Sequence, residues 1–435
     1  DDGGAVARPG LQRGWSAKVV LPTQSMGENK LVYICNISKS GVQQLSADLA
    51  VSHRAEKLEL RHSYVGPEGT AVLAEGLAKN RGLRYVNLRN SEVGDHGAVA
   101  LGTKLASQTT LQELDLCSNG IGDIGAEALA TFVRSSKTIQ RLLLRDNRIG
   151  VRGARNLGEA LRENCSLQTL ALGINDTKDA AAKFVCEALL ANPLTALRNL
   201  DLGGNGLTDV GCEDLNLALL CETCPLEKLE LRANRIGDEG CRLICEALMV
   251  NLRLKDLDLS LNAIGDPGAE SLSLMLLKNK VLQKLLLEDN FISDEGAEEM
   301  LRLMQRASPE GEEGLQLTKL DLAGNLLTDI CVLKVDIFLK THAKELKARK
   351  GGARKRAQGA TKLSDAEDSA GDGSRAATKS SAGDRTISKG GESDEGQKKK
   401  GRDDRPSAPV KISASGNAVP AEVLAELRMG GGSKR

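Results

Sequence analysis

The stretch that decides the fold is residues 111–138, LQELDLCSNGIGDIGAEALATFVRSSKT, because close copies of it recur along most of the chain. Its apolar positions begin with a period of two at Leu114 and Leu116 and then change to helical spacing around Ala126 and Leu129. A period of two is typical of a strand with one buried face, and a period near 3.6 is typical of an amphipathic helix. Each copy is therefore predicted to form a strand, a turn and a helix.

The repeat length is marked by the residue aligned with Asn119 in each copy. Its spacing from one copy to the next is 28, 28, 28, 28, 30, 29, 28, 28 and 35 residues. The aligned residues are Ser63, Ser91, Asn119, Asn147, Asn175, Asn205, Asn234, Asn262, Asn290 and Asn325. Six positions after most of them comes a glycine, at 69, 97, 125, 153, 211, 240, 268 and 296. Such a ladder is typical of a solenoid, in which each repeat packs only against its neighbours.

The residue types at the repeated positions have physical roles. Stacked strands would project their paired leucines into the interior, and the Asn amide, with a donor and an acceptor, can satisfy backbone groups where each strand turns away. The glycine permits a conformation or a close approach that a Cβ would obstruct. One unit cannot fold alone, because its few buried aliphatic side chains contribute about 1.5 to 3 kcal/mol each, whereas backbone ordering costs roughly 1 to 2 kcal/mol per residue.

The consensus LxxLxLxxNxIGxxGAxxLAxxL resembles the ribonuclease-inhibitor class of leucine-rich repeat, and it extends over residues 55 to about 345. A degenerate unit precedes it, in which Val32, Ile37, Gly41 and Leu45 stand 28 residues before Leu60, Val65, Gly69 and Leu73. The resemblance implies an α/β fold, a curved solenoid or horseshoe with parallel strands on its concave face and helices on its convex face. Proteins of this class include ribonuclease inhibitor, the Ran GTPase-activating protein, the sensor halves of immune receptors and subunits of ciliary complexes, and they share the binding of other proteins.

Composition divides the chain into three regions. Residues 1–29 are expected to be a disordered leader, residues 30–345 a repeat domain of about ten to eleven units with a C-terminal cap helix, and residues 346–435 a disordered, low-complexity basic tail. From position 347 onward there are 20 Lys or Arg and 12 Asp or Glu, a net charge of +8, so the preceding residues, with 39 and 47, carry −8. No apolar run reaches about 18 residues, so no membrane span is expected.

Three departures from the consensus predict local differences. Thr177 and Ala181 replace the usual Ile and Gly in the fifth unit, so its turn should differ in shape. Residues 307–314, ASPEGEEG, are an insertion that is expected to form an acidic loop. The sequence after Leu327 predicts a helix that covers the end of the stack.

Recognition is expected on the concave strand face, where outward residues alternate with buried leucines. Its amino-terminal part combines Arg with aromatic and aliphatic side chains, a mixture that suits an interface hot spot. The candidate partner-binding residues are Arg61, Tyr85, Arg89, Arg141, Leu143, Arg145 and Arg232. The small row Thr169, Ala171 and Gly173 is expected to leave a flat surface that a partner's backbone can approach. The alternative, that these side chains are solvated surface without a partner, stays open at this point.

Residues that could carry chemistry form no recognisable site. Cys212 and Cys241 stand where other units have Ala, so they are expected to be small core residues. Cys221 and Cys224 form a single CxxC without further zinc ligands, and the glycines of residues 203–211 fall on the repeat's turn rather than in a phosphate loop. The histidines, expected at the surface, are His53, His62, His96 and His342. We therefore expect no catalytic, cofactor-binding or metal site, and thiols in core positions favour a reducing compartment.

The tail offers a second contact. Residues 347–356, KARKGGARKR, hold six basic residues in ten, and residues 420–430, PAEVLAELRMG, have Pro at a helix start, Val423, Leu424 and Leu427 on one side, and Gly as a stop. Basic runs of this kind serve as nuclear signals or phosphate-binding arms, and solvated linkers have the same composition. Nucleic acid is allowed as a partner but not favoured.

The expected function is a non-enzymatic scaffold that binds a protein partner on the concave face, as a subunit of a larger assembly. Ciliary and cytoskeletal assemblies fit by analogy, with a cytoplasmic location. One alternative is a nuclear or RNA-associated factor that acts through the basic tail. A second is a GTPase-activating protein of the Ran type, which the basic character of the tail disfavours.

Overall fold

The computed structural model describes residues 31–33, 37–307 and 314–367, with side chains for 37–307 and 314–348. It divides into two compact units, and the boundary falls between Leu339 and Lys340. All the strands described belong to the first unit. The leader at 1–29, most of the insertion at 307–314 and the helix pattern at 420–430 lie outside the described residues, so those predictions stay untested.

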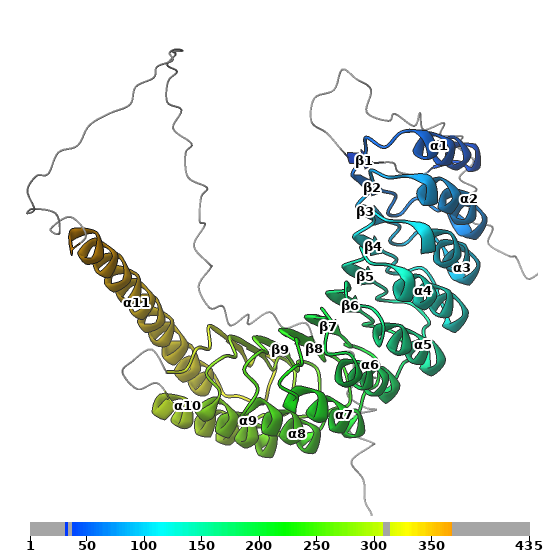
Figure 1. Cartoon of the computed structure of the whole chain (residues 1–435). Coiled ribbons are helices and arrows are strands. Elements are labelled where there is room, and N and C mark those ends of the chain that lie inside the picture. The colour runs from blue at the N-terminus through cyan, green and yellow to red at the C-terminus, as the bar shows by residue number, and fades with distance from the viewer. Residues whose placement is uncertain (1–30, 34–36, 308–313, 368–435) are drawn as a thin grey trace, which may run out of the picture. The chain divides into compact units, whose positions relative to one another are not determined.

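Among the residues that the structure describes, eleven short strands form one parallel sheet in sequence order. The strands are β1 Leu31–Tyr33, β2 Lys57–Glu59, β3 Tyr85–Asn87, β4 Glu113–Asp115, β5 Arg141–Leu143, β6 Thr169–Ala171, β7 Asn199–Asp201, β8 Lys228–Glu230, β9 Asp256–Asp258, β10 Lys284–Leu286 and β11 Lys319–Asp321. The register places equivalent leucines opposite one another, as in Leu114 with Leu142 and Leu142 with Leu170. Within the first unit the strands line the concave side (Figure 1).

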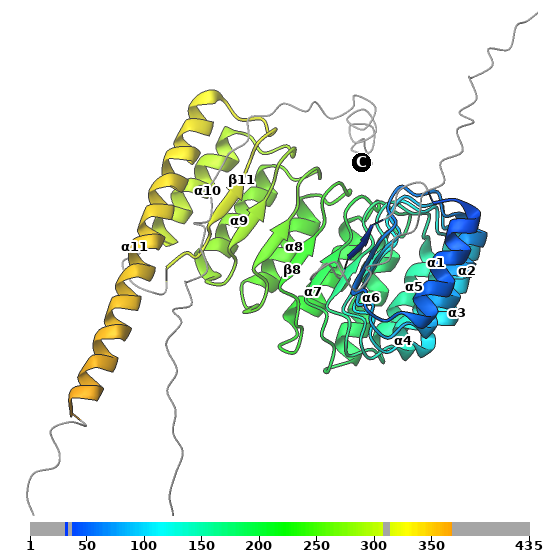
Figure 2. The same cartoon turned by 90° about the horizontal axis from the view of Figure 1, so that it is seen from above.

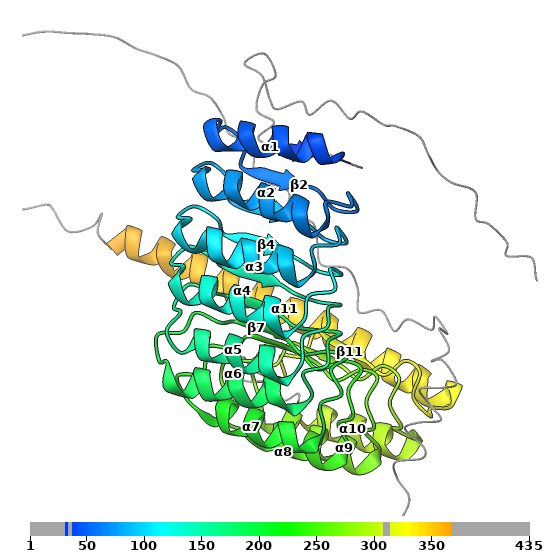
Figure 3. The same ribbon diagram turned by 90° about the vertical axis from the view of Figure 1, so that its right-hand side faces the viewer.

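A helix follows each strand, and from α1 to α10 each helix packs on the next along the convex side, so that strands and helices form two layers (Figures 2 and 3). The helices are α1 Lys39–Val51, α2 Gly66–Lys79, α3 Gly94–Lys104, the short 3₁₀ turn η1 Leu105–Ser107, α4 Asp123–Ser135, α5 Val151–Leu161, α6 Asp179–Ala191, α7 Asp209–Leu220, α8 Asp238–Leu248, α9 Asp266–Lys278, α10 Asp294–Ala307 and α11 Asp329–Glu367. The core lies between the layers, where the middle strand leucines meet helix residues such as Leu129 and Leu157. This confirms the predicted solenoid.

The asparagine ladder makes the hydrogen bonds that its chemistry predicts. Asn119 Nδ2 donates to the carbonyl of Leu88 in the preceding unit at 2.9 Å, and its Oδ1 accepts from the N–H groups of Ser91 and Val93 at 2.9 and 3.2 Å. At Ser91 the hydroxyl donates to the Leu60 carbonyl at 2.9 Å. Serine therefore keeps the bond to the preceding unit.

A second ladder, of aspartates at the helix starts, was not predicted. Asp123 Oδ1 accepts from the N–H groups of Gly150 and Gly153 in the next unit, at 2.7 and 2.8 Å. A carboxylate at a helix N-terminus satisfies unpaired donors and interacts favourably with the helix dipole. A Cβ on Gly153 would lie 2.8 Å from Asp123 Oδ1 and 2.9 Å from Ala126 Cβ. Close approach is therefore why this position is glycine.

The fifth unit differs at its turn, as predicted, and the aspartate ladder explains why. Its helix α6 follows Lys178, which has φ 52°, whereas Gly122 before α4 is extended with φ −102°. The preceding helix α5 begins at Val151 instead of Asp. Without that carboxylate, the Lys178 N–H donates to the Asn205 carbonyl at 3.1 Å.

The first unit corrects a predicted register. Val32 pairs with Leu58 rather than Leu60, an offset of 26 residues. The helix keeps the offset of 28. A Cβ on Gly41 would contact Ile37, and a Cβ on Gly69, 28 residues later, would contact the equivalent residue, Val65. The connection from strand to helix is therefore two residues shorter in this unit.

The last helix corrects the predicted tail boundary and one histidine. α11 continues to Glu367, through residues that the sequence analysis places in a disordered tail. Ala, Lys, Arg and Gln are good helix formers, and extending an existing helix costs little compared with nucleating one. His342, expected at the surface, is buried because it falls on the same side of α11 as Leu339 and Leu346. None of the helices described is long and apolar enough to span a membrane.

Candidate functional site

The concave face is formed by the first and third residues of each strand and by the residue two positions later. The middle residue of each strand is buried, as at Leu58, Leu142 and Leu229, so its neighbours point outward. The seven predicted partner-binding residues all occupy such outward positions. Their surroundings divide them into two groups.

Five of the seven predicted residues lie within the span of β2 to β5, either on β3 and β5 or just after β2 and β3. We call them the amino-terminal cluster: Arg61, Tyr85, Arg89, Arg141 and Leu143. The side chains of Arg61, Arg89 and Arg141 are exposed, and Leu143 is half-buried. Arg89 enters none of the ion pairs among the residues that the structure describes. The cluster thus presents guanidinium groups around apolar and aromatic surface.

Tyr85 is the aromatic centre of this cluster. Lys57 Nζ lies 5.8 Å from the centroid of its ring, within the range of a cation–π interaction. Asn87 Nδ2 donates to its hydroxyl at 3.0 Å. Burial, together with the nearby carboxylate of Glu59, raises the pKa of Tyr85 to about 12. The phenol is therefore neutral at physiological pH and can donate its own proton to a partner.

Arg141 has an intramolecular partner, but a weak one. Its guanidinium lies 3.5 Å from Glu113 Oε2, with 52% of the Arg141 side chain exposed. Burial raises the pKa of Glu113, and Arg141 lowers it. Exposed ion pairs of this kind contribute about 0 to 1 kcal/mol, so a partner can recruit Arg141 at little cost.

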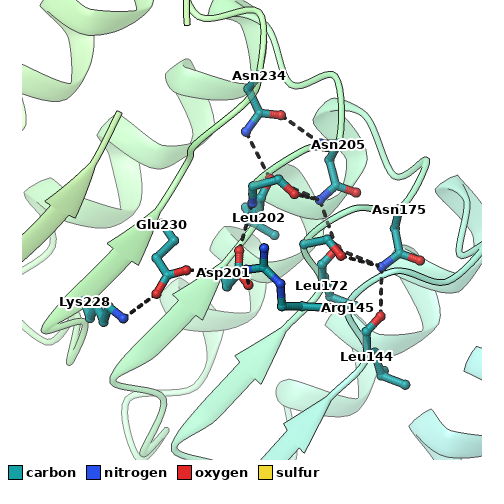
Figure 4. A network of polar contacts seen from close by, with 12 residues as sticks. Leu144, Arg145, Leu172, Asn175, Asp201, Leu202, Asn205, Lys228, Glu230 and Asn234 are labelled. Carbon is teal, nitrogen blue, oxygen red and sulfur yellow. Dashed lines mark hydrogen bonds and ion pairs between the residues drawn. The ribbon is translucent and has the colours of Figure 1, made fainter. Parts of the chain in front are cut away.

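Arg145 is instead held by carboxylates of the same chain. Its guanidinium crosses β6 to form an ion pair with Asp201 on β7, and it lies 3.5 Å from Glu230 on β8 (Figure 4). Gly173 stands at the crossing point, where a Cβ would lie 3.0 Å from Arg145 Cζ. In the predicted flat row of Thr169, Ala171 and Gly173, the Gly173 end is therefore covered by an arginine and not open to a partner's backbone.

Asp201 is the buried end of this network. It accepts from the Gly203 N–H at 3.0 Å and pairs with Arg145. Burial raises its pKa more than these two contacts lower it. Loss of Arg145 would thus leave a buried carboxylate without its cation.

The carboxyl-terminal part of the face is likewise internally paired. Arg232 donates to Glu288 at 2.8 Å across Ser260, which is fully buried beneath it. Lys284 lies 2.7 Å from Asp256. Of the predicted residues, Arg145 and Arg232 therefore belong to intramolecular networks rather than to the amino-terminal cluster.

Comparison with known proteins agrees with the architecture. A family model described as a leucine-rich repeat matches residues 79–102, 107–130, 194–215, 224–245 and 250–273. Pig (Sus scrofa) ribonuclease inhibitor is 39% identical over 75 residues, which are 17% of this chain and 16% of that protein. The repeats of this chain are leucine-rich repeats similar to those of ribonuclease inhibitor.

Other relatives match over similarly short segments. The cattle (Bos taurus) NACHT, LRR and PYD domains-containing protein 5 is 38% identical over 77 residues, 18% of this chain and 7% of that protein. The matches thus span a small part of these relatives' own length. A solved internalin from Listeria monocytogenes, 19% identical, covers 71% of this chain and 84% of its own with a TM-score of 0.40. Leucine-rich repeats are in general scaffolds for protein interaction.

Two exposed apolar residues in the turns that follow the strands were missed by sequence reasoning. Tyr64 is 69% exposed with φ 46°, just after the strand that carries Arg61. Ile174 is 51% exposed with φ 55°, a conformation that costs a β-branched residue of order 1 to 3 kcal/mol. The available signal was position: Ile174 precedes a ladder Asn, where most other units have a polar residue or Gly and none has a β-branched residue.

The cysteines of the repeats differ in accessibility. Cys117 lies on the concave face but is buried, which raises its pKa to about 12. Cys212 and Cys241 are fully buried, which confirms their predicted core positions. Cys221 is partly exposed, and hydrogen bonds from Thr223 lower its pKa. Within residues 37–307 and 314–348 no cluster of three or more His, Cys, Asp or Glu has a metal-binding arrangement.

Proposed function

We propose that this protein is a non-enzymatic scaffold that binds a protein partner through the amino-terminal cluster of its concave face. The observation that supports the proposal is the contrast along the sheet. Arg145 and Arg232, which follow β5 and β8, are matched by Asp201, Glu230 and Glu288. Arg89, by comparison, is exposed and enters no ion pair among the described residues.

The chemistry of the cluster suits an acidic partner with an apolar contact. Guanidinium groups bind carboxylates through two parallel hydrogen bonds, and Arg and Tyr are enriched among residues that dominate interface energy. Tyr85 already lies against Lys57 and Asn87, so little side-chain freedom is lost when a partner covers it. We expect an acidic loop or helix whose apolar residues pack on Tyr85 and Leu143.

The wider setting is a proposal of the same kind. We infer a subunit of a larger assembly, in the cytoplasm or on the cytoskeleton or cilium, with residues 347–356 or 420–430 as a second contact. The nine cysteines that the structure describes are free thiols, and most are buried, which suits a reducing compartment. Cell fractionation with an antibody to the chain tests the location; recovery in the nucleus alone would favour the tail-driven alternative.

A photo-cross-linking experiment tests the binding face. A photoreactive phenylalanine analogue at Leu143 is compared with the same analogue at Leu286, the equivalent half-buried position on β10. After irradiation in an extract of the native source, a protein should be cross-linked at Leu143 and not at Leu286. Cross-linking of the same protein only at Leu286, or from neither position, would contradict the proposal.

A further inference from the structure

An apolar patch lies at the carboxyl ends of three neighbouring helices, away from the concave face. We call it the helix-end patch: Leu190, Leu194, Leu220, Val250 and Leu252. Their exposed fractions are 45%, 75%, 46%, 62% and 75%. Single exposed aliphatic residues are ordinary, but a group of them on one edge marks an interaction site.

The patch is continuous because equivalent positions stack. Leu190 and Leu220 occupy the same position on α6 and α7, which pack side by side (Figure 3). Asn251, between Val250 and Leu252, donates to the carbonyl of Leu219 at 2.8 Å. That bond holds the loop after α8 against the end of α7.

Folding alone does not call for these residues. Arg134 and Arg162 occupy on α4 and α5 the position of Leu190, and Lys278 on α9 occupies the position of Val250. A cation near a helix C-terminus contributes about 0.3 to 1 kcal/mol through the helix dipole. The three helices of the patch forgo that stabilisation and expose apolar surface instead.

The border of the patch is charged. Arg162 and Lys278 flank it on the neighbouring helices, and Arg253 follows Leu252 in the loop; all three are exposed. Acids on this border are Glu222, after α7, and Glu187 on α6, whose carboxylate lies 3.2 Å from the Arg162 guanidinium. Lys278 and Arg253 enter no ion pair among the described residues. A matching ligand therefore has a small apolar side with carboxylates beside it and one cation.

We propose that the helix-end patch binds residues 420–430 of this same chain, PAEVLAELRMG, as a short amphipathic helix. Val423, Leu424 and Leu427 supply the apolar side, and Glu422, Glu426 and Arg428 supply the complementary charges. Roughly 50 residues separate this segment from the end of α11, and a random coil of that length has a root-mean-square span of about 40 Å. The proposal does not depend on the concave face, so either can fail alone.

Hydrogen exchange of the full chain, read by mass spectrometry, tests this docking. Amides of residues 421–429 should exchange at least ten-fold more slowly than in a free peptide of the same sequence. The double variant Leu220→Asp/Val250→Asp should restore the rate of the free peptide. The reverse change, Glu422→Lys/Glu426→Lys, should also release the segment, without touching the folded repeats.

The matched control is Ile124→Asp, which changes another exposed apolar residue, 64% accessible on α4. It should leave the protection of residues 421–429 unchanged, and unaltered exchange of the α7 interior should show that the patch variant still folds. Exchange at the free-peptide rate in the wild type would overturn the proposal. Protection that persists in the patch variant would place the segment elsewhere, and protection lost on hundred-fold dilution would identify a second copy; both also overturn it.

Discussion

At the scale of single residues, the two ladders show what side-chain chemistry alone can predict. Asparagine in a repeated position implied an amide that bonds to the backbone through both its donor and its acceptor. Asn119 makes those bonds, to Leu88 and Ser91. The partner of Arg145 could not be predicted, because Asp201 lies 56 residues away and two strands across. Pairing at that distance depends on a glycine at the crossing and on side-chain length, not on the repeat pattern.

The phenol of Tyr85 gives a prediction in alkaline solution. The ultraviolet titration of the wild type minus that of Tyr85→Phe should be centred near pH 12, because burial raises this pKa from its ordinary value of 10.0. Since the folded pKa is raised, the native state keeps the proton, and the associated stability is lost as pH rises from about 10 through 12. A difference curve centred near pH 10 would show that Tyr85 is not buried as described.

The thiols give a prediction for labelling under native conditions. Brief alkylation near pH 7.5 should modify the exposed Cys165 and the partly exposed Cys221, whose pKa is lowered by Thr223. Cys117 should react only after unfolding, because burial raises its pKa to about 12. Peptide mass mapping reads the result; rapid labelling of Cys117 in the folded chain would contradict its buried position.

At the scale of elements, the capping aspartates hold one helix start against the next. Asp123→Ala should lower the free energy of unfolding by about 1 to 2 kcal/mol, because the N–H groups of Gly150 and Gly153 lose their acceptor. Glu127→Ala, at an exposed acidic position on α4, is the control and should change it by less than about 0.5 kcal/mol. Equal changes in the free energy of unfolding for the two substitutions, measured in urea, would show that the aspartate ladder has no structural role.

The crossing of β6 by Arg145 gives a second prediction for elements. Gly173→Val should destabilise the chain by about 1 to 3 kcal/mol, since a Cβ there would meet Asp201 and Arg145. The same change at the equivalent position of the last unit, Ala323→Val, should cost less. In the double variant Gly173→Val/Arg145→Ala the total loss should be smaller than the sum of the two single losses, and strictly additive energies in this cycle would show that the two residues do not interact.

Element boundaries divide into those the pattern predicts and those it does not. Strands and helices from residue 57 onward follow from the period of two and the period near 3.6. The shorter first connection and the length of α11 did not, because both depend on local chain length and on helix extension past the last packed turn. A helix after Leu327 was predicted, whereas its continuation to Glu367 was not.

At the scale of the whole molecule, an acidic body and a basic tail offer two routes to a partner, and salt separates them. Binding through the concave face should weaken less than ten-fold between 50 and 200 mM salt, because apolar contacts contribute to it. Nucleic-acid binding through six or more cations of the tail would fall by about 10³-fold or more over the same range. A steep salt dependence that disappears when the basic residues of 347–356 are replaced by Ser would favour the tail as the main binding element.

The central claim is that the amino-terminal cluster captures the partner. The most direct measurement is the affinity of the native partner for the wild type, for Arg61→Glu/Arg89→Glu and for Lys79→Glu/Lys104→Glu, which reverses two exposed charges on the helices of the same units. Two reversed hot-spot arginines, at about 2 kcal/mol or more each, should weaken binding by at least 100-fold, whereas the helix variant should stay within about three-fold. Unchanged affinity in Arg61→Glu/Arg89→Glu, with the fold intact, would contradict it.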